Sequence, residues 1–322
     1  FRTQARCSPD LKVYRGLDEL PPPRRAAVTV GNFDGVHSGH RGIIRRLLAR
    51  ARGGGGLATV VTFHPHPQLV LRGVAPPALG TLEERLDLLA EAGVGQTLVL
   101  PFDQALAQVE PEEFLSHVLV GGLGASVIVV GSNFRFGRMA RGDSTMLRSL
   151  GRTLGYIFEG VRLKELEGRR VSSTEIRHAL AAGDLRWANM ALGRPHRLRG
   201  WIVRGRGRGR GLGYPTANLQ PDPRLALPAT GIYAGRLLLD EGPLDCAVSV
   251  GTNPTFGEGP LTIEAYALDF PGGDLYGRAG AIEFVGRLRD EGAFASEETL
   301  REAIASDVAA ARGILRRGGS GH

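Results

Sequence analysis

Short apolar runs alternate with helical patterns through the first half of the chain. Four runs rich in β-branched residues predict strands, at 26–31, 58–63, 97–100 and 126–131. Apolar residues recur with helical spacing in four further segments, at 39–51, 81–92, 111–120 and 173–182. Strands that alternate with helices predict an α/β domain with a parallel sheet, in which ligands bind at the carboxyl ends of the strands.

The pattern changes near Gly193. Short strands separated by turns follow, at 199–204, 231–239, 245–250, 261–269 and 281–287. A helix is predicted at 296–312, where Ser296 can cap the first turn; a full capping box is not expected, because Thr299 stands where an acid or amide would close it. This half therefore predicts a small antiparallel β-barrel with a terminal helix. With a boundary near 185–197, the predicted domains are 1–186 and 187–322.

Composition narrows the class of protein. The 322 residues suffice for about two domains and carry a net charge of +7. Only Lys12 and Lys164 are lysine, and neither lies in a Walker P-loop or in the setting of a protein-kinase lysine. Phosphate chemistry here would need another scaffold.

Signals for secretion and membrane insertion are absent from the sequence. Two distant cysteines, Cys7 and Cys246, favour a reducing compartment over a disulfide framework. The first nine residues lack the apolar stretch of a signal peptide, and no apolar run approaches the ~20 residues that cross a membrane. We expect a soluble cytoplasmic protein that does not bind membranes.

The segment 31–40 reads GNFDGVHSGH and links a predicted strand to a predicted helix. His37 and His40 are three residues apart, so their side chains point the same way, and the amides at a helix start attract phosphate. Nucleotidyl transfer needs such donors around an aligned attack on phosphorus. Two alternatives are a structural histidine pair and a metal site that includes His64 and His66. The glycine spacing favours phosphate over metal.

Three other segments accompany this motif. Residues 171–177 (VSSTEIR) place hydroxyls at a helix start with an arginine one turn in, which forms either an anion site or a plain cap. Two other segments lie at the ends of predicted strands, 62–67 (TFHPHP) and 130–137 (VGSNFRFG). They could pack against a flat ring, or they could be ordinary loops on the core.

The second half contains another candidate site. Residues 205–218 read GRGRGRGLGYPTAN, a glycine-rich loop followed by a defined turn. Thr216 and Asn218 alternate onto one side of an extended chain, where their oxygens can ligate Mg²⁺. Glu264 shares a strand face with Thr262 and is a candidate general base, although a single strand carboxylate more commonly faces solvent. The alternative for the glycine-rich tract is non-specific RNA binding.

These motifs carry a family resemblance. G-x-F-D-x-x-H-x-G-H followed by S-S-T-x-x-R resembles the HxGH nucleotidyltransferase superfamily, whose fold is Rossmann-like. With 62–67 and 133–137 it resembles the adenylyltransferase half of prokaryotic bifunctional riboflavin kinase/FMN adenylyltransferases (FAD synthetases). G-R-G-L-G-Y-P-T-A-N-L, G-I-Y-A-G, V-G-T-N-P-T-F and I-E-A-Y resemble the riboflavin kinase half, except that Tyr214 replaces the usual phenylalanine.

The resemblance implies roles for individual residues. Catalytic roles fall to His37 and His40, which would contact the ATP phosphates, and to Glu264, which would accept the proton of the ribityl hydroxyl. Nucleotide binding is implied for Gly31, Phe33, Asp34, Gly39, Ser172, Ser173, Thr174, Arg177, Gly211 and Gly213. Flavin contact is implied for Pro65, Pro67, Asn133 and Phe136. Thr216 and Asn218 would ligate Mg²⁺.

The implied function is flavin cofactor biosynthesis by a two-part transferase. One half would phosphorylate riboflavin to FMN with ATP, and the other would adenylylate FMN to FAD and release pyrophosphate. The expected partners are riboflavin, FMN and ATP, without nucleic acid. Two alternatives remain: an enzyme with one active half, and an RNA-binding protein that uses the arginine-rich tract.

Overall fold

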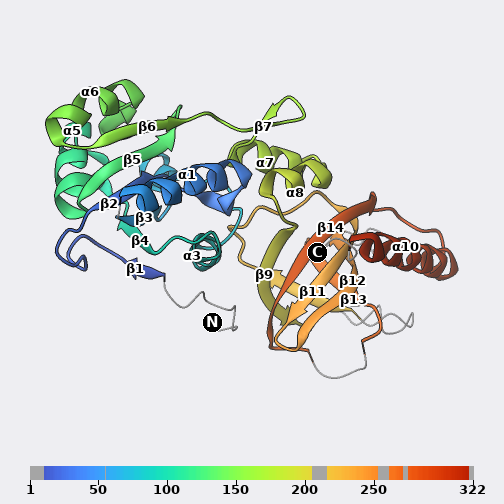
Figure 1. The fold of residues 1–322 in the computed structure, drawn as a ribbon. Coiled ribbons are helices and arrows are strands. Elements are labelled where there is room, and N and C mark those ends of the chain that lie inside the picture. Colours follow the sequence, from blue (N-terminus) through green and yellow to red (C-terminus); the bar gives the residue numbers. More distant parts are fainter. Residues whose placement is uncertain (1–10, 55, 205–215, 253–260, 271–274, 319–322) are drawn as a thin grey trace. The chain divides into compact units, whose positions relative to one another are not determined.

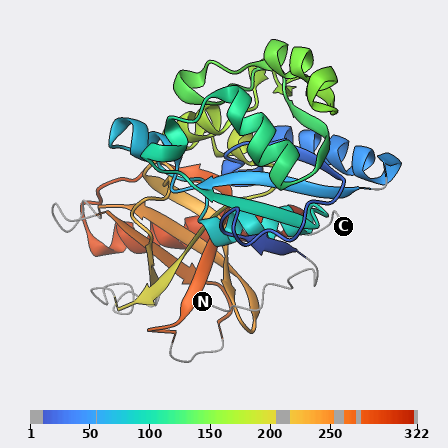
Figure 2. The same ribbon diagram turned by 90° about the vertical axis from the view of Figure 1, so that its left-hand side faces the viewer.

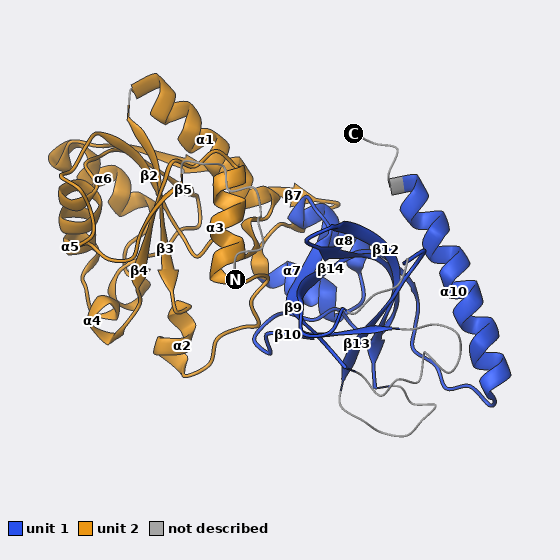
Figure 3. Cartoon of the chain, turned by 90° about the horizontal axis from the view of Figure 1, so that it is seen from below, with its two compact units in different colours: residues 1–4, 174–322 blue, residues 5–173 orange. Residues whose placement is uncertain are grey.

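The computed structural model describes residues 11–54, 56–204, 216–252, 261–270 and 275–318. The chain forms two compact units, shown in Figure 3. Unit 2 comprises residues 5–173, and unit 1 comprises residues 1–4 and 174–322. Residues 185–197, near which the sequence places the domain boundary, lie within unit 1.

Unit 2 is built on a six-stranded sheet in which every strand pair is parallel. The strand order is β1-β4-β3-β2-β5-β6 (Figure 1). The strands are β1 (Lys12–Tyr14), β2 (Ala26–Val30), β3 (Leu57–His64), β4 (Gln96–Pro101), β5 (Ala125–Gly131) and β6 (Ile157–Val161). The predicted α/β fold class with a parallel sheet is confirmed.

Helices cover both faces of this sheet (Figure 2). On one face, α1 (Ser38–Gly54) and α3 (Leu82–Glu91) bury side chains such as Leu47 and Leu89. On the other, the helix at Phe114–Gly122 and α6 (Ser144–Leu154) bury Leu115 and Leu147. Short connecting elements are η1 (Asp34–Val36), α2 (Pro67–Arg72), α4 (Gln104–Ala107), α5 (Pro111–Glu113), η3 (Arg138–Ala140), β7 (Glu165–Leu166) and β8 (Arg169–Arg170).

Details of the helices differ from the sequence prediction. The helix expected at 111–120 opens as α5 and continues as a π-helix to Gly122. The predicted capping box of α3 is present, since Thr81 Oγ1 accepts from Glu84 N at 3.2 Å and Glu84 Oε2 accepts from Thr81 N at 2.9 Å. Pairing between the cap and the first turn therefore fixes where α3 begins.

Unit 1 contains a closed barrel of six antiparallel strands, which confirms the predicted antiparallel barrel. The sequence predicted only five of these strands and missed β10. The strand order is β10-β13-β12-β11-β14-β9, and β9 pairs with β10 to close it. The strands are β9 (His196–Val203), β10 (Ala217–Pro221), β11 (Gly231–Leu239), β12 (Gly242–Gly251), β13 (Thr262–Ala267) and β14 (Ala279–Arg289). The helices in the described part of unit 1 are α7 (Ser173–Ala181, whose first residue belongs to unit 2), α8 (Leu185–Leu192) and α10 (Glu297–Gly318).

The terminal helix α10 packs on the barrel through apolar and ionic contacts. Ala311 and Leu315 are buried against Ala234 of β11. The Arg289 guanidinium donates to both oxygens of Asp307, at 2.9 and 2.7 Å. Charge-assisted pairs of this two-bond geometry are stronger than single neutral hydrogen bonds. The pair therefore fixes α10 against β14.

The start of α10 corrects one expectation. Ser296 Oγ accepts from Thr299 N at 3.2 Å, as predicted, but Thr299 Oγ1 also accepts from Ser296 N at 3.2 Å. The reciprocal bond of a capping box is therefore formed by a threonine hydroxyl in place of an acid or amide.

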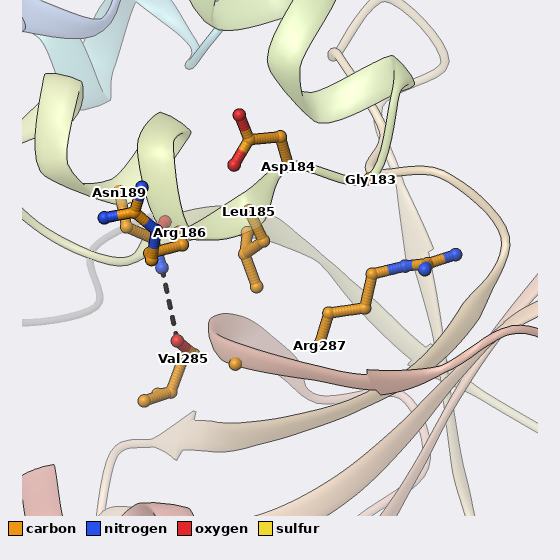
Figure 4. Close-up of a pocket in the computed structure, with 8 residues that line it drawn as sticks. Gly183, Asp184, Leu185, Arg186, Asn189, Val285 and Arg287 are labelled. Atoms are coloured by element: carbon orange, nitrogen blue, oxygen red, sulfur yellow. Dashed lines mark hydrogen bonds between the residues drawn. The ribbon is translucent and has the colours of Figure 1, made fainter. Parts of the chain in front are cut away.

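A pocket of about 400 Å³ lies where the α7–α8 turn meets β14 (Figure 4). Asn189 of α8 lines it and ties the elements together, because its Nδ2 donates to Phe284 O at 2.8 Å and its Oδ1 accepts from His196 N at 2.8 Å. None of the site residues predicted from the sequence lines this pocket.

Across the described residues, no helix combines the length and the apolar character that a membrane span requires.

Candidate active sites

The loop from β2 to α1 has an unusual backbone. Phe33, Gly35 and Val36 have φ angles of 49°, 74° and 39°, in the left-handed region. Glycine adopts this region freely, whereas a β-branched valine rarely does. Such conformations persist where the surroundings hold them, and both carboxylate oxygens of Asp34 accept from Leu79 N, at 3.0 and 3.2 Å. Buried Asp34 thus anchors the loop that presents the histidine motif.

The two histidines of the motif are stacked. Their ring centroids are 3.6 Å apart with planes inclined by 16°, and His37 Nδ1 accepts from the backbone N of His40 at 3.3 Å. A Cβ on Gly39 would lie 3.2 Å from the His37 ring and 3.5 Å from Val171 O. The glycine between the histidines therefore leaves room for the stacked arrangement.

Electrostatics keep His40 uncharged. Burial, the neighbouring His37 and the positive charge of Arg85 together lower the pKa of His40 well below its ordinary value. His37 Nδ1 already accepts a hydrogen bond, so a neutral His37 ring carries its proton on Nε2. His40 is therefore suited to donating a hydrogen bond as a neutral imidazole at pH 7.

The end of β3 lies against this loop. Thr62 Oγ1 donates to Asn32 O at 3.0 Å, and Asn32 Nδ2 is 3.2 Å from His66 Nε2. Residues 64 and 65 are joined by a cis peptide, and His66 caps α2 by accepting from Gln68 N at 3.2 Å. These contacts bring the histidine motif and the 62–67 segment together. Pro65 and Pro67, which belong to that segment, are partly buried.

The predicted hydroxyl cluster divides between the compact units. Ser173 Oγ donates to Asp34 O at 3.0 Å, which joins the start of α7 to the histidine loop within unit 2. Ser172 is partly buried. Thr174 and Arg177 belong to unit 1, and their nucleotide role stays a prediction.

The predicted flavin contacts after β5 have different surroundings. Asn133 is exposed. Phe136 is 8% exposed, stacks on Phe134 with centroids 5.4 Å apart, and packs near Phe114 at 6.2 Å. Packing on the core accounts for Phe136 without a ligand, so its flavin contact remains a prediction, as does that of Asn133.

The second site is assembled on the barrel. Asn218 of β10 is paired opposite Glu264 of β13, and Ser249 of β12 is paired opposite Glu264 on its other side. Directly opposite residues of antiparallel strands project from the same face. Thr216 Oγ1 donates to Glu264 Oε2 at 3.3 Å. The structure therefore brings together Thr216, Asn218 and Glu264, which the sequence assigned to one site.

The donor set of this second site suits a hard cation. A threonine hydroxyl, an asparagine amide and a carboxylate all offer oxygen, the ligand that Mg²⁺ prefers. Gly211 and Gly213, assigned to nucleotide binding, lie outside the described residues. Among the described residues, no group of three or more histidines, cysteines or acids could hold a metal ion, and the four histidines of 37–66 form no such group.

Sequence reasoning missed two residues near these sites. Thr262 Oγ1 lies 3.5 Å from Glu264 Oε1, and its position two residues away on the same strand face was the available signal. Arg85 is 7% exposed and donates to Thr62 Oγ1 at 3.0 Å. Its place among the apolar positions of α3 signals a buried arginine.

Each unit has the parts of a nucleotide-dependent transferase. A parallel sheet presents two stacked histidines after β2, the strand-end position at which α/β folds bind ligands. A closed barrel gathers a carboxylate with hydroxyl and amide oxygens. Two such sites on one chain are the arrangement expected of a two-part transferase that uses nucleotides.

Comparison with known proteins gives the family. The FAD synthetase family matches residues 20–175, and the riboflavin kinase family matches residues 192–315. A bifunctional riboflavin kinase/FMN adenylyltransferase of Pseudomonas fluorescens is 40% identical over 306 residues, which cover 94% of this chain and 98% of that protein. The Escherichia coli K12 protein of the same description is 37% identical and is 97% covered. The chain belongs to the family of bifunctional riboflavin kinase/FMN adenylyltransferases.

A solved structure shares the whole fold. A crystal structure described as a macrolide-efflux protein from Streptococcus pneumoniae superposes with a TM-score of 0.85 at 29% identity. The match covers 94% of this chain and 98% of that one. This likeness extends across both units.

Proposed function

We propose that this chain makes FAD from riboflavin in two steps, each of which uses ATP. Unit 1 phosphorylates riboflavin to FMN, and unit 2 adenylylates FMN to FAD. The observation that carries this proposal is the presence on one chain of the stacked pair His37–His40 and of the group Thr216–Asn218–Glu264. Family membership supports the same pair of reactions.

The adenylylation step takes place beside the histidine loop. A phosphate oxygen of FMN attacks the α-phosphorus of ATP, the bond from that phosphorus to the bridging oxygen breaks, and pyrophosphate leaves. The histidines donate hydrogen bonds to phosphate oxygens on which charge develops. Amides at the start of α1 lack intrahelical acceptors and add to this anion site.

Flanking residues orient the reactants. Gly31, Phe33, Asp34 and Gly39 shape the loop around the phosphates, with Ser172, Ser173, Thr174 and Arg177 as the second phosphate-binding segment. Pro65 and Pro67 with Asn133 and Phe136 form the flavin side. This arrangement holds the two substrates in line for the displacement.

The phosphorylation step uses Glu264 as general base. Its carboxylate takes the proton of the terminal ribityl hydroxyl, the hydroxyl oxygen attacks the γ-phosphorus, and the bond to the bridging oxygen breaks to release ADP. Thr216 donates to Glu264 and keeps one carboxylate oxygen in place. Gly211 and Gly213 belong to the segment that approaches the nucleotide.

Mg²⁺ is part of the proposal for the kinase half. Thr216 and Asn218 would hold it through their side-chain oxygens. When bound, the ion neutralises charge on the ATP phosphates. The cysteine usage of the chain favours the cytoplasm as its location.

A time course of flavin products tests the function. The full chain is mixed with riboflavin, ATP and Mg²⁺, and flavins are separated by chromatography. FMN followed by FAD is expected. Separate runs with His37→Ala should form FMN without FAD, and runs with Glu264→Gln should form FAD only when FMN is supplied. No flavin product from either substrate would refute the proposal, and salt-sensitive RNA binding in its place would favour the RNA-binding alternative.

A further inference from the structure

A buried arginine is hydrogen-bonded to the end of β3, which contacts the histidine loop. Arg85 projects from the first turn of α3 and is 7% exposed. Its Nη1 donates to two acceptors at the end of β3, Thr62 Oγ1 at 3.0 Å and Phe63 O at 3.1 Å. Both acceptors come just before the segment that carries Pro65 and Pro67. Arg85 therefore holds the carboxyl end of β3 to α3.

The contact continues into the histidine loop. Thr62 Oγ1 receives the bond from Arg85 and donates its own hydrogen to Asn32 O at 3.0 Å. Asn32 follows Gly31 and begins the segment that leads to His37. A relay of two hydrogen bonds thus runs from α3, through β3, to the loop after β2.

The guanidinium of Arg85 is buried, and one of its donors, Nε, has no hydrogen-bond partner among the described residues. Burial lowers the pKa of Arg85, and the carboxylates of Asp34 and Glu83 act in the opposite direction. Both oxygens of Asp34 are engaged by Leu79 N. Burying a guanidinium costs free energy that an apolar side chain at this site would not, which suggests that the charge serves the reaction.

The histidines lie within reach of this charge. The pKa of His40 is lowered by burial first, then by His37 and by Arg85. Phosphate is the complementary ligand for a loop with a fixed positive charge beneath it. Arg85 thus contributes both hydrogen bonds and charge. Substitutions at Arg85 and Thr62 can measure these two contributions separately.

We infer that Arg85 is a positioning residue for adenylyl transfer, which fixes the histidine loop through Thr62 and supplies a fixed positive charge beneath the ATP phosphates. The inference rests on the proposed adenylyl transfer at His37 and His40. It predicts that the hydrogen-bond relay and the charge make distinct contributions to FAD formation.

Three substitutions separate these contributions. Arg85→Met removes the donors and the charge, Arg85→Lys keeps the charge and some donor capacity, and Thr62→Val breaks the relay while it keeps the charge and the volume. Arg45→Met is the matched control, because Arg45 is an exposed arginine of α1 in the same unit. Rates of FAD formation from FMN and ATP are measured from pH 5 to 8. Far-UV circular dichroism of the same samples is the folding control for unit 2, which carries the substitutions, and riboflavin phosphorylation shows that unit 1 is intact.

The expected results differ between variants. Arg85→Met should lower kcat/KM for FAD formation by about 10–100-fold, because small misplacements of the groups that hold the substrates are costly. Loss of the positive charge should also move the acid limb of the profile to higher pH. Arg85→Lys should recover most of the rate and the original acid limb. Thr62→Val should lower the rate by roughly 3–10-fold with the acid limb unchanged, as for one lost hydrogen bond. Arg45→Met should match the unaltered chain.

The contrary outcomes are distinct. If the unaltered chain forms no FAD, the proposed function fails and the role of Arg85 fails with it. If the unaltered chain forms FAD and Arg85→Met does so equally well, only the role of Arg85 is refuted. Should Arg85→Met unfold, an unchanged rate in both Arg85→Lys and Thr62→Val would refute positioning. A Lys variant no better than Met, with normal phosphorylation, would refute the role of the charge.

Discussion

Asn218 and Glu264 lie directly opposite each other on strands β10 and β13, although 46 positions separate them in the sequence. Thr216 reaches the same carboxylate with a hydrogen bond of 3.3 Å. The antiparallel register of the barrel places these side chains on one face. The barrel therefore assembles the proposed kinase site from segments that are distant in the sequence.

Replacement of Glu264 by glutamine should stop riboflavin phosphorylation selectively. Glutamine keeps the size and a hydrogen-bonding oxygen but cannot accept the ribityl proton at neutral pH. We expect the phosphorylation rate to fall by roughly 10²–10⁴-fold, the contribution of a general base. Chromatography of FMN produced from riboflavin measures this, with FAD formation from supplied FMN as the internal control. A near-normal phosphorylation rate would remove the role of Glu264 as base.

A methyl group at Gly39 should disturb the adenylylation half alone. The added Cβ would lie 3.2 Å from the His37 ring, so the stack on His40 must shift. We expect Gly39→Ala to lower FAD formation by about 10-fold or more, because small misplacements of catalytic groups are costly. Gly42→Ala is the matched control on the same helix, since its Cβ would meet only the end of Arg45 at 4.0 Å. Equal rates for the two variants would contradict the proposed use of the histidine stack.

The ion pair between Arg289 and Asp307 should stabilise unit 1. Asp307 is 8% exposed, and its loss leaves the guanidinium without its two strong bonds. We expect Asp307→Ala to lower the unfolding free energy of unit 1 by about 1–3 kcal/mol. Both tryptophans, Trp187 and Trp201, lie in unit 1, so their fluorescence during urea unfolding reports on this unit.

An exposed pair provides the control for that measurement. Asp269 also binds an arginine of α10, since Arg312 donates to its oxygens at 2.6 and 2.8 Å, but its side chain is 73% exposed. Asp269 has a φ of 59°, a left-handed conformation that asparagine tolerates better than alanine, so the control substitution is Asp269→Asn. Because solvent screens exposed pairs, Asp269→Asn should change stability little. Equal effects of the two substitutions would show that the Arg289 pair adds nothing beyond a surface contact.

Much of the fold could be predicted because its pattern is local. The four central strands of unit 2 are apolar runs buried on both faces of the sheet. The cap of α3 is formed by Thr81 and Glu84, whose spacing in the sequence identifies a capping box. The edge strands β1 and β6 were missed, since three residues in β1 and the mixed sequence IFEGV in β6 lack a continuous apolar run. β1 and β6 form strands because they hydrogen-bond to the neighbouring strands β4 and β5.

The candidate sites were predicted unevenly for a similar reason. The histidine motif and the Thr216–Asn218 turn are contiguous, so their residue types and spacing carry the chemistry. Arg85 and Asn189 act through partners far along the chain, at Thr62 and Phe284. The sequence shows that these polar residues stand at helix positions that usually carry apolar residues. Only the packed fold shows which carbonyl or hydroxyl group each of them hydrogen-bonds to.

Acid should destabilise unit 1 through His196. This residue begins β9, is 1% exposed, and has Nε2 2.9 Å from Ala226 O. Burial, opposed by the bond to Ala226 and assisted by the charge of Arg194, lowers the pKa of His196 from 6.5 to about 4. Above pH 6.5 the ring is neutral in both folded and unfolded chains, so it contributes no pH dependence there.

Between pH 6.5 and 4 the unfolded chain takes up a proton that the folded barrel excludes. The unfolding free energy must therefore fall as the pH falls through this window, by about 1.4 kcal/mol per unit and by roughly 3 kcal/mol in all. His196→Gln can still donate to Ala226 O but does not titrate, so its stability should decline less steeply. Urea unfolding followed by tryptophan fluorescence at pH 7 and pH 5 measures the difference. His178→Gln, at an exposed position of the same unit, should leave the slope unchanged. If His196→Gln declined as steeply as the unaltered chain, the acid sensitivity would have to come from other groups.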